Sequence, residues 1–413
     1  MRLVLAAAAA AVLGGGFSPS AEWAPRELPI SFWCGPPDPH INVEQYRRIA
    51  EAGFNWLMPP CEGASTRERN LRILDTARAA GLKAFLQDER IPNRITGEPD
   101  ARQRLDAVVA DYSRHPAFAG YFVWDEAPAS MFAGLGEVVS YLREKDPAHP
   151  AYLNIWPNYA GPRYLGTATY AEHVTEFLRQ VKPFVLSYDH YPFLKERDRP
   201  EYFSNLTAIR THAQRAAIPF WQIIQLVPHG GYRPVTEGEL RWQAFHTLAH
   251  GGQGVMYFTY WTPDDPAFQW GPAIIARDGT PTPQYEVVKR VNADLRAVGR
   301  HLVRGVHATV FHAGTPAPGS PGREEGTPVE VPGPGDVSVG LWRADTHLYV
   351  LCVNRNYRAP TRTELHCATA GRTVERLDRR TGRWSRIRTE STLDGALKAV
   401  LELAAGDGEL LRW

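Results

Sequence analysis

The first part of the chain alternates short apolar runs with stretches whose apolar residues recur at helical spacing. Eight apolar or aromatic runs predict strands at Ile30–Cys34, Phe54–Met58, Ala84–Gln87, Gly120–Trp124, Ala151–Ile155, Phe184–Tyr188, Phe220–Ile224 and Val255–Tyr260. One of the segments between them has apolar residues at i, i+3, i+4 and i+7: Leu135, Val138, Val139 and Leu142. Gly53 and Gly81 follow Ala-rich segments and directly precede strands, as glycines that end helices do. The pattern therefore predicts eight strand–helix units.

Eight such units are typical of a (β/α)₈ TIM barrel, which we predict over residues 22–302. The alternative is a doubly wound open sheet. It is disfavoured because residues 33–37, after the first strand, carry no Gly-rich phosphate-binding pattern. Residues 303–335, rich in Pro and Gly, predict a linker and the start of a second domain. Alternating runs over 336–413 predict a small antiparallel β-sandwich, which we expect to be accessory because it lacks a cluster of catalytic residue types.

The N-terminus resembles a cleaved signal peptide over residues 1–21. Arg2 precedes a short apolar run, and small residues suited to cleavage follow. We therefore expect a secreted or periplasmic protein, the alternative being a frayed apolar N-terminus. Export would permit the disulfides Cys34–Cys61 and Cys352–Cys367, although buried free thiols fit the sequence equally well. No other segment is long and apolar enough to span a membrane.

The composition narrows the possible ligands only slightly. A formal net charge of +1 gives no electrostatic reason to expect a nucleic acid or an anionic membrane as partner. The chain has 12 Trp, 17 Tyr and 16 Phe, which favours aromatic surfaces suited to sugars, although aromatic residues also fill cores.

Acidic residues gather where the predicted strands end, and barrel active sites lie at those ends. The sharpest case is Asp125-Glu126, which follows an apolar strand directly and precedes Pro128. Ionised carboxylates are costly beside a barrel core, so the pair indicates a function. The structural alternative is that Asp125 caps the next helix or pairs with a base. Glycoside hydrolysis needs one acid, a second carboxylate and flat rings to hold the sugar.

Three segments carry a resemblance to a known group. They are the GY-x-x-x-DEP pattern around residues 120–128, the stretch 242–258 and the helix-like stretch 282–288. The chain is similar to clan A glycoside hydrolases, in particular to bacterial proteins of the family 42 β-galactosidase type. This resemblance implies an acid/base at Glu126, with Asp125 in place of the preceding Asn of the clan. It also implies a site Tyr at Tyr188 and a sugar-binding Trp at Trp261.

The same resemblance places the nucleophile of strand seven at Gln225, and an amide cannot readily form a glycosyl ester. We therefore predict Asp189 as the second catalytic residue beside Glu126, with Asp88, Glu89 and Glu62 as further candidates. The alternative for Asp189 is that it fixes a loop or binds substrate. A more distant carboxylate would imply an inverting enzyme, and assistance by the substrate is another route. The predicted substrate-binding residues are Asp125, Asp88, Trp156, Tyr188, His190, Gln225 and Trp261.

The sequence thus predicts a secreted glycoside hydrolase that acts on O-glycosidic bonds of a polysaccharide or oligosaccharide. The alternative is a barrel that binds carbohydrate but has lost its nucleophile, and a lyase is a third possibility. No spaced ligand motif predicts a metal, and no cofactor is expected. Neither the sugar nor the oligomeric state follows from the sequence.

Overall fold

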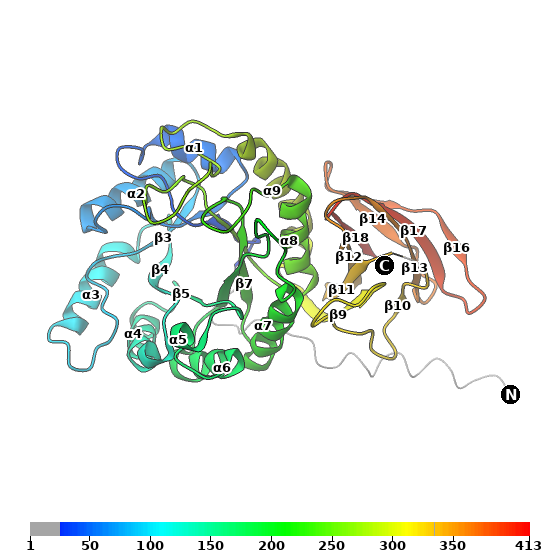
Figure 1. The fold of residues 1–413 in the computed structure, drawn as a ribbon, viewed down its shortest axis with the longest axis horizontal. Coiled ribbons are helices and arrows are strands. Elements are labelled where there is room, and N and C mark those ends of the chain that lie inside the picture. The colour runs from blue at the N-terminus through cyan, green and yellow to red at the C-terminus, as the bar shows by residue number, and fades with distance from the viewer. Residues whose placement is uncertain (1–24, 334) are drawn as a thin grey trace.

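The computed structural model describes residues 25–333 and 335–413, so the predicted signal peptide lies outside the described residues. Its first domain is a barrel of eight parallel strands inside a ring of helices, which confirms the predicted (β/α)₈ fold (Figure 1). The strands are β1 (Ile30–Phe32), β2 (Trp56–Leu57), β3 (Lys83–Leu86), β4 (Phe118–Asp125), β5 (Ala151–Ile155), β6 (Leu186–His190), β7 (Phe220–Gln225) and β8 (Val255–Phe258). The helices are α1 (Val43–Glu51), α2 (Arg67–Ala79), α3 (Ala101–Tyr112), α4 (Phe132–Lys145), α5 (Pro162–Leu165), α6 (Tyr170–Val181), α7 (Tyr202–Ala216), α8 (Glu237–Ala249) and α9 (Pro283–Leu302).

Large aromatic side chains fill the inside of the barrel. The rings of Trp56 and Trp221 meet edge to face with centroids 5.6 Å apart, and Tyr152 stacks on Trp221 at 5.9 Å. Phe85 and Trp33 complete this interior cluster, which is buried throughout. Part of the high tryptophan content therefore has a structural explanation, because these rings occupy the space that branched aliphatic residues fill in most barrels.

The second domain is a sandwich of two antiparallel sheets, as predicted. One sheet has six strands in the order β15-β14-β18-β12-β11-β9, and the other has four in the order β10-β13-β17-β16. Their bounds are β9 (Val306–Ala313), β10 (Val329–Glu330), β11 (Val337–Ala344), β12 (His347–Asn354), β13 (Thr361–Cys367), β14 (Glu375–Asp378), β15 (Arg383–Arg386), β16 (Thr389–Ser391), β17 (Leu397–Leu403) and β18 (Gly408–Arg412). Within the segment expected to contain a linker, β9 is already an edge strand of the larger sheet.

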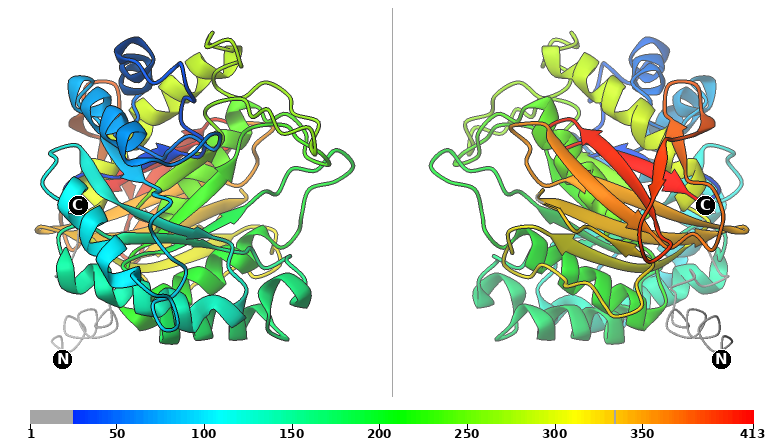
Figure 2. Two further views of the ribbon diagram at one scale, coloured as in Figure 1. Left: turned by 90° about the vertical axis from the view of Figure 1, so that its left-hand side faces the viewer. Right: turned by 90° about the vertical axis from the view of Figure 1, so that its right-hand side faces the viewer.

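The six-stranded sheet packs directly on helices α8 and α9 of the barrel (Figures 1 and 2). A Cβ atom on Gly340 would lie 2.2 Å from the carbonyl oxygen of Ala249, so no larger residue fits at this contact. The Trp342 indole N–H donates to the Leu248 carbonyl at 3.2 Å. Apolar side chains of both domains belong to one continuous core. The two domains are therefore expected to unfold together.

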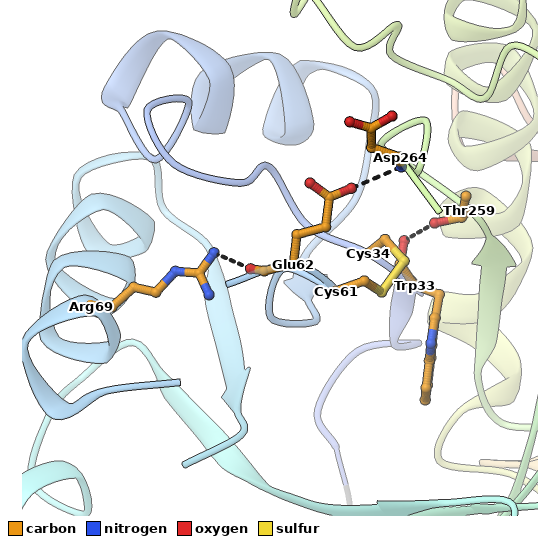
Figure 3. Close-up of a disulfide and its surroundings, with 7 residues drawn as sticks. All are labelled: Trp33, Cys34, Cys61, Glu62, Arg69, Thr259 and Asp264. Carbon is orange, nitrogen blue, oxygen red and sulfur yellow. Dashed lines mark hydrogen bonds between the residues drawn. A yellow bond between two sulfur atoms is a disulfide. The ribbon is translucent and has the colours of Figure 1, made fainter. Parts of the chain in front are cut away.

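A disulfide joins Cys34, just after β1, to Cys61, beyond β2 (Figure 3). Beside it, the Glu62 carboxylate accepts a hydrogen bond from the backbone N–H of Asp264, in the loop after β8, at 2.9 Å. These contacts fasten three loops on one side of the barrel mouth. The second pair of cysteines remains as buried free thiols: Cys352 and Cys367. None of the helices within residues 25–333 and 335–413 is long and apolar enough to cross a membrane.

Candidate active site

Three carboxyl groups meet at the carboxyl ends of β4 and β6. Asp125 is the last residue of β4 and Glu126 follows it, while Asp189 lies in β6. Asp189 is 4% exposed and Glu126 is partly buried, whereas Asp125 is accessible to solvent. Glu126 and Asp189, the predicted catalytic pair, lie in hydrogen-bonding contact. The structure thus brings together side chains that are 63 positions apart because both strands end at the same edge of the sheet.

Asn154, on the intervening strand β5, bridges the acids. Its side-chain amide donates to an oxygen of Asp189 at 3.0 Å and to an oxygen of Asp125 at 3.2 Å. Its carbonyl oxygen accepts from the Ser187 hydroxyl at 3.1 Å, and Ser187 shares a hydrogen bond of 2.7 Å with the Tyr152 hydroxyl. Ser187 and Tyr152, which lie inside the barrel, therefore fix the orientation of the Asn154 amide. Asn154 was not among the predicted site residues. The signal that could have identified it is a polar amide within the otherwise apolar strand 151–155.

Glu126 has the environment of a carboxyl group that keeps its proton. Burial raises its pKa well above the usual range, and the nearby charges of Asp189 and Asp125 raise it further. Its backbone has φ of 52°, a left-handed conformation that costs a residue other than glycine about 1–2 kcal/mol. Its N–H donates to the Asn154 carbonyl at 2.9 Å, which ties the turn to β5. A strained turn held in this way is common at functional sites.

The two aspartates differ from Glu126 because hydrogen bonds favour their charged forms. Burial raises the pKa of Asp189, while the amide of Asn154 and the proton of Glu126 both lower it. Burial and the charge of Asp189 raise the pKa of Asp125, and Asn154 again opposes the shift. Water reaches Asp125, so we expect its shift to be the smaller one in solution. Of the three carboxyl groups, Glu126 is therefore the one that stays protonated, and Asp189 is a buried carboxylate that accepts its hydrogen bond.

Aromatic side chains from four loops form a wall beside the acids. Tyr191, which follows Asp189, lies close enough to all three carboxyl groups for their charges to raise its pKa, although its burial is the larger cause. Its ring stacks on Phe258 at 5.1 Å and meets Tyr232 edge to face at 5.7 Å. Farther out, His229 stacks on Trp270 at 5.0 Å. Tyr159 also belongs to the wall, because the charge of Asp189 raises its pKa, and Phe268 meets Trp270 edge to face at 5.5 Å. After β5, Trp156 and Tyr164 contact each other at 5.2 Å. Partly accessible rings of this kind suit the C–H faces of sugars.

Two predicted substrate contacts, Tyr188 and His190, point away from the carboxyl cluster. Tyr188 and His190 alternate with Asp189 along β6, so their side chains point toward the helices while that of Asp189 points inward. Tyr188 is fully buried in the layer between sheet and helices. The His190 ring bonds Asn205 of α7 at 2.8 Å, and burial lowers its pKa to about 3. Strand periodicity, which the prediction did not apply to this run, is the physical reason for the difference.

Gln225 is also placed differently from its prediction as a substrate contact. Its side-chain oxygen accepts from the N–H of Phe193 at 2.8 Å, and its amide donates to the carbonyls of Phe193 and Arg233 at 2.9 and 3.2 Å. The side chain is fully buried. All its hydrogen-bonding capacity joins the loop after β6 to the loop after β7, so an amide here has a structural role.

Asp88 is buried beyond β3 and accepts hydrogen bonds from Arg90 at 2.9 Å and from the Tyr112 hydroxyl at 2.5 Å. These partners, and not the cleft, occupy its oxygens. Trp261 is 3% exposed and packs against His40 at 4.6 Å, which leaves little of its ring for a sugar. Trp156 remains partly accessible.

The other candidate acids are apart from the cluster. Glu62 binds the Asp264 N–H, and Glu89 is an exposed residue after β3. Among the residues that the structure describes, no group of three or more His, Cys, Asp or Glu side chains has an arrangement that could hold a metal ion.

No protein-family model and no curated protein matches the sequence. Solved structures do match it. A beta-galactosidase from Bacillus circulans sp. alkalophilus aligns with a TM-score of 0.62 and 10% identity over 94% of this chain and 99% of that chain. A catalytic mutant of Gan42B, a GH42 beta-galactosidase from G. stearothermophilus, aligns with a TM-score of 0.60 and 10% identity over 94% and 98%.

A beta-galactosidase from the psychrophilic Marinomonas ef1 aligns with a TM-score of 0.51 and 12% identity over 66% of this chain. The chain spans only 60% of the length of that protein. At such identities the similarity concerns the fold. It is a TIM barrel with a C-terminal β domain, as in GH42 and other clan A glycoside hydrolases.

Proposed function

We propose that this protein is a secreted glycoside hydrolase that cleaves O-glycosidic bonds of a polysaccharide or oligosaccharide. The observation that carries the proposal is the contact between Glu126 and Asp189 in a mouth lined by aromatic rings. Environments that separate the pKa values of two neighbouring carboxyl groups are how glycosidases obtain an acid and a base at one pH.

Glu126 is the general acid. Its raised pKa keeps a proton on the carboxyl group at neutral pH, ready for transfer to the oxygen of the leaving sugar. Asp189, ionised and held by Asn154, faces the positive charge that develops at the anomeric carbon. Asp125 adds negative charge to the site and raises the proton affinity of Glu126.

The closeness of the pair favours a retaining mechanism. Inverting enzymes need about 6.5–9.5 Å between the carboxyl groups to admit a water, and retaining enzymes about 5–5.5 Å. Glu126 and Asp189 lie closer together than the carboxyl groups of either class, so a bound sugar has to part them in both cases, and by less to reach the retaining distance. In this proposal Asp189, from β6, attacks the anomeric carbon in place of a residue at the Gln225 position.

Export remains part of the proposal. The predicted signal peptide lies outside the described residues, but the Cys34–Cys61 disulfide supports an oxidising compartment because such bonds rarely persist in the cytosol.

The test compares Glu126→Gln and Asp189→Asn on aryl glycosides with good and poor leaving groups. Glu126→Gln should lose about 10²–10⁴-fold in rate on poor leaving groups and much less on dinitrophenyl glycosides, which need no proton. Asp189→Asn should fail on both. Asn158→Leu, a loop substitution away from the acids, serves as control. Equal rates in all four proteins would exclude the assignment.

One observation favours a second candidate, a barrel that binds carbohydrate without cleaving it. The two carboxyl groups touch, which is closer than either catalytic separation. Binding of glycans by wild type and Glu126→Gln alike, with no release of product across a broad panel, would establish this alternative.

A further inference from the structure

A groove runs from the outer face of the four-stranded sheet of the sandwich to strands β14 and β15 of the six-stranded sheet. It consists of two adjoining hollows of about 560 and 480 Å³, which share Arg362, Glu364 and Val400. Strands β13, β17 and β16 carry this face and lie on the side of the sandwich away from the barrel (Figure 1). An elongated hollow suits a chain molecule better than a single small ion. We call it the arginine groove.

The arginine groove has an excess of positive charge. Its charged lining residues are Arg362, Arg376, Arg386, Arg388, Lys398, Glu364 and Glu390. Both carboxylates pair with the same ammonium group, since Lys398 Nζ lies 3.7 Å from Glu364 and 3.0 Å from Glu390. Across the described residues, none of the four arginines forms an ion pair or a side-chain hydrogen bond, and all four are exposed.

This concentration contrasts with the rest of the molecule. The whole chain has a net charge of +1, whereas the groove lining alone has an excess of three positive charges. Like charges held together repel, so the cluster costs stability unless a ligand compensates it. Elsewhere in the sandwich arginines do find partners, as Arg379 does with Asp407 at 2.7 Å. Arg388 and Arg376 interact electrostatically with Glu390 and Glu409 without forming an ion pair. The groove therefore presents four exposed guanidinium groups that have no ion-pair partner among the described residues.

The chemistry of the lining indicates the ligand. Guanidinium groups bind carboxylates and sulfates through paired hydrogen bonds. Val400, 41% exposed in the floor, offers an apolar surface to the C–H face of a sugar ring. We propose that the arginine groove is a second binding site, separate from the carboxyl cluster, for an acidic polysaccharide of the polyuronate type. That the ligand is a polyanion follows from the groove alone; the choice of a glycan over a nucleic acid rests on the proposed function.

Calorimetric titration of the full chain with polygalacturonate tests the proposal, with neutral dextran and single-stranded DNA as comparison ligands. The double variant Arg386→Gln/Arg388→Gln should bind polygalacturonate about tenfold more weakly or worse, since charge-assisted hydrogen bonds are lost. The matched control Arg343→Gln/Arg380→Gln removes two exposed arginines outside the groove and should bind as wild type does. Raising the salt concentration should weaken wild-type binding steeply.

Three results would overturn the proposal: no binding by wild type at low salt, the same loss in the control variant, or tighter binding of DNA than of polygalacturonate. Thermal unfolding of each variant verifies that the fold is intact. The titration measures binding and requires no cleavage of the ligand. A failed hydrolysis assay would thus leave the groove result standing, and the reverse also holds.

Discussion

The role assigned to Asn154 leads to a quantitative prediction. Its amide donates to Asp189 at 3.0 Å in a site that excludes water from that aspartate. Replacing Asn154 by Leu keeps the approximate volume of the side chain and removes both donors. The variant loses a hydrogen bond that stabilises the ionised form of Asp189, while burial still disfavours that form. The pKa of Asp189, which is already above the ordinary range, must therefore rise further.

The size of the shift follows from the strength of the lost bond. A hydrogen bond to a charged group contributes about 1.5–3 kcal/mol, and one pKa unit corresponds to about 1.4 kcal/mol. Asn154→Leu should therefore raise the pKa of Asp189 by about 1–2 units. Asp125 should shift less, because it is exposed and its bond to the amide is longer, at 3.2 Å.

NMR of the carboxyl carbons measures this directly and needs no substrate. Once a substrate is known, the acid limb of kcat/KM against pH should move to higher pH by the same amount, since Asp189 must be ionised. Asn158→Leu is the control, because Asn158 contacts α7 and not the acids. An unchanged titration of Asp189 in Asn154→Leu would refute the reasoning.

Three further predictions concern stability in urea or heat. The fold raises the pKa of Asp189, so the protonated form of this residue stabilises the protein at low pH, and this stabilisation is lost as the pH rises through the raised pKa. Asp189→Asn should therefore raise the free energy of unfolding at pH 8 by about 1–2 kcal/mol and leave it unchanged at low pH. Replacing Cys34 and Cys61 together by Ser opens a link across 27 positions and should cost about 3 kcal/mol in urea, whereas a loss near zero would mean that the bond is not formed. Asp407→Asn removes a charge-assisted hydrogen bond from the half-buried Arg379 and should cost about 1.5–3 kcal/mol in one calorimetric transition. Two separate transitions would contradict the continuous core.

The fold could be predicted from the sequence because its signals are local. Each predicted strand of the barrel overlaps an observed one, and Gly53 and Gly81 have φ of 84° and 73° where helices α1 and α2 end. The juxtaposition of Glu126 and Asp189 followed from the same logic, since barrel topology alone brings strand ends together. For the second domain, the alternating runs over 336–413 predicted the class of the fold, but its first strand, β9 (Val306–Ala313), lies before that range.

The direction of individual side chains was harder to predict. His190 and Gln225 stand at strand ends, as a site residue should, yet one faces a helix and the other binds loop backbone. Each outcome depends on partners distant in sequence, such as Asn205 and Phe193, which no local pattern identifies. Asn154 shows the converse, because its position between two acids exists only once three strands are side by side.

The aromatic residues that composition brought to attention have two separate roles, and the roles are linked. Tyr152 stacks on Trp221 inside the barrel, and its hydroxyl holds Ser187, which orients the Asn154 amide beneath Asp189. The close packing of the barrel interior makes it stiff, so the chain of hydrogen bonds from Tyr152 through Ser187 to Asn154 is held rigidly as well. Displacing a catalytic group by about 1 Å can cost about a hundredfold in rate. In the proposed mechanism, the rings inside the barrel therefore help to position a catalytic group without contacting a sugar, while the rings of the wall, from Tyr191 outward, are left to bind it.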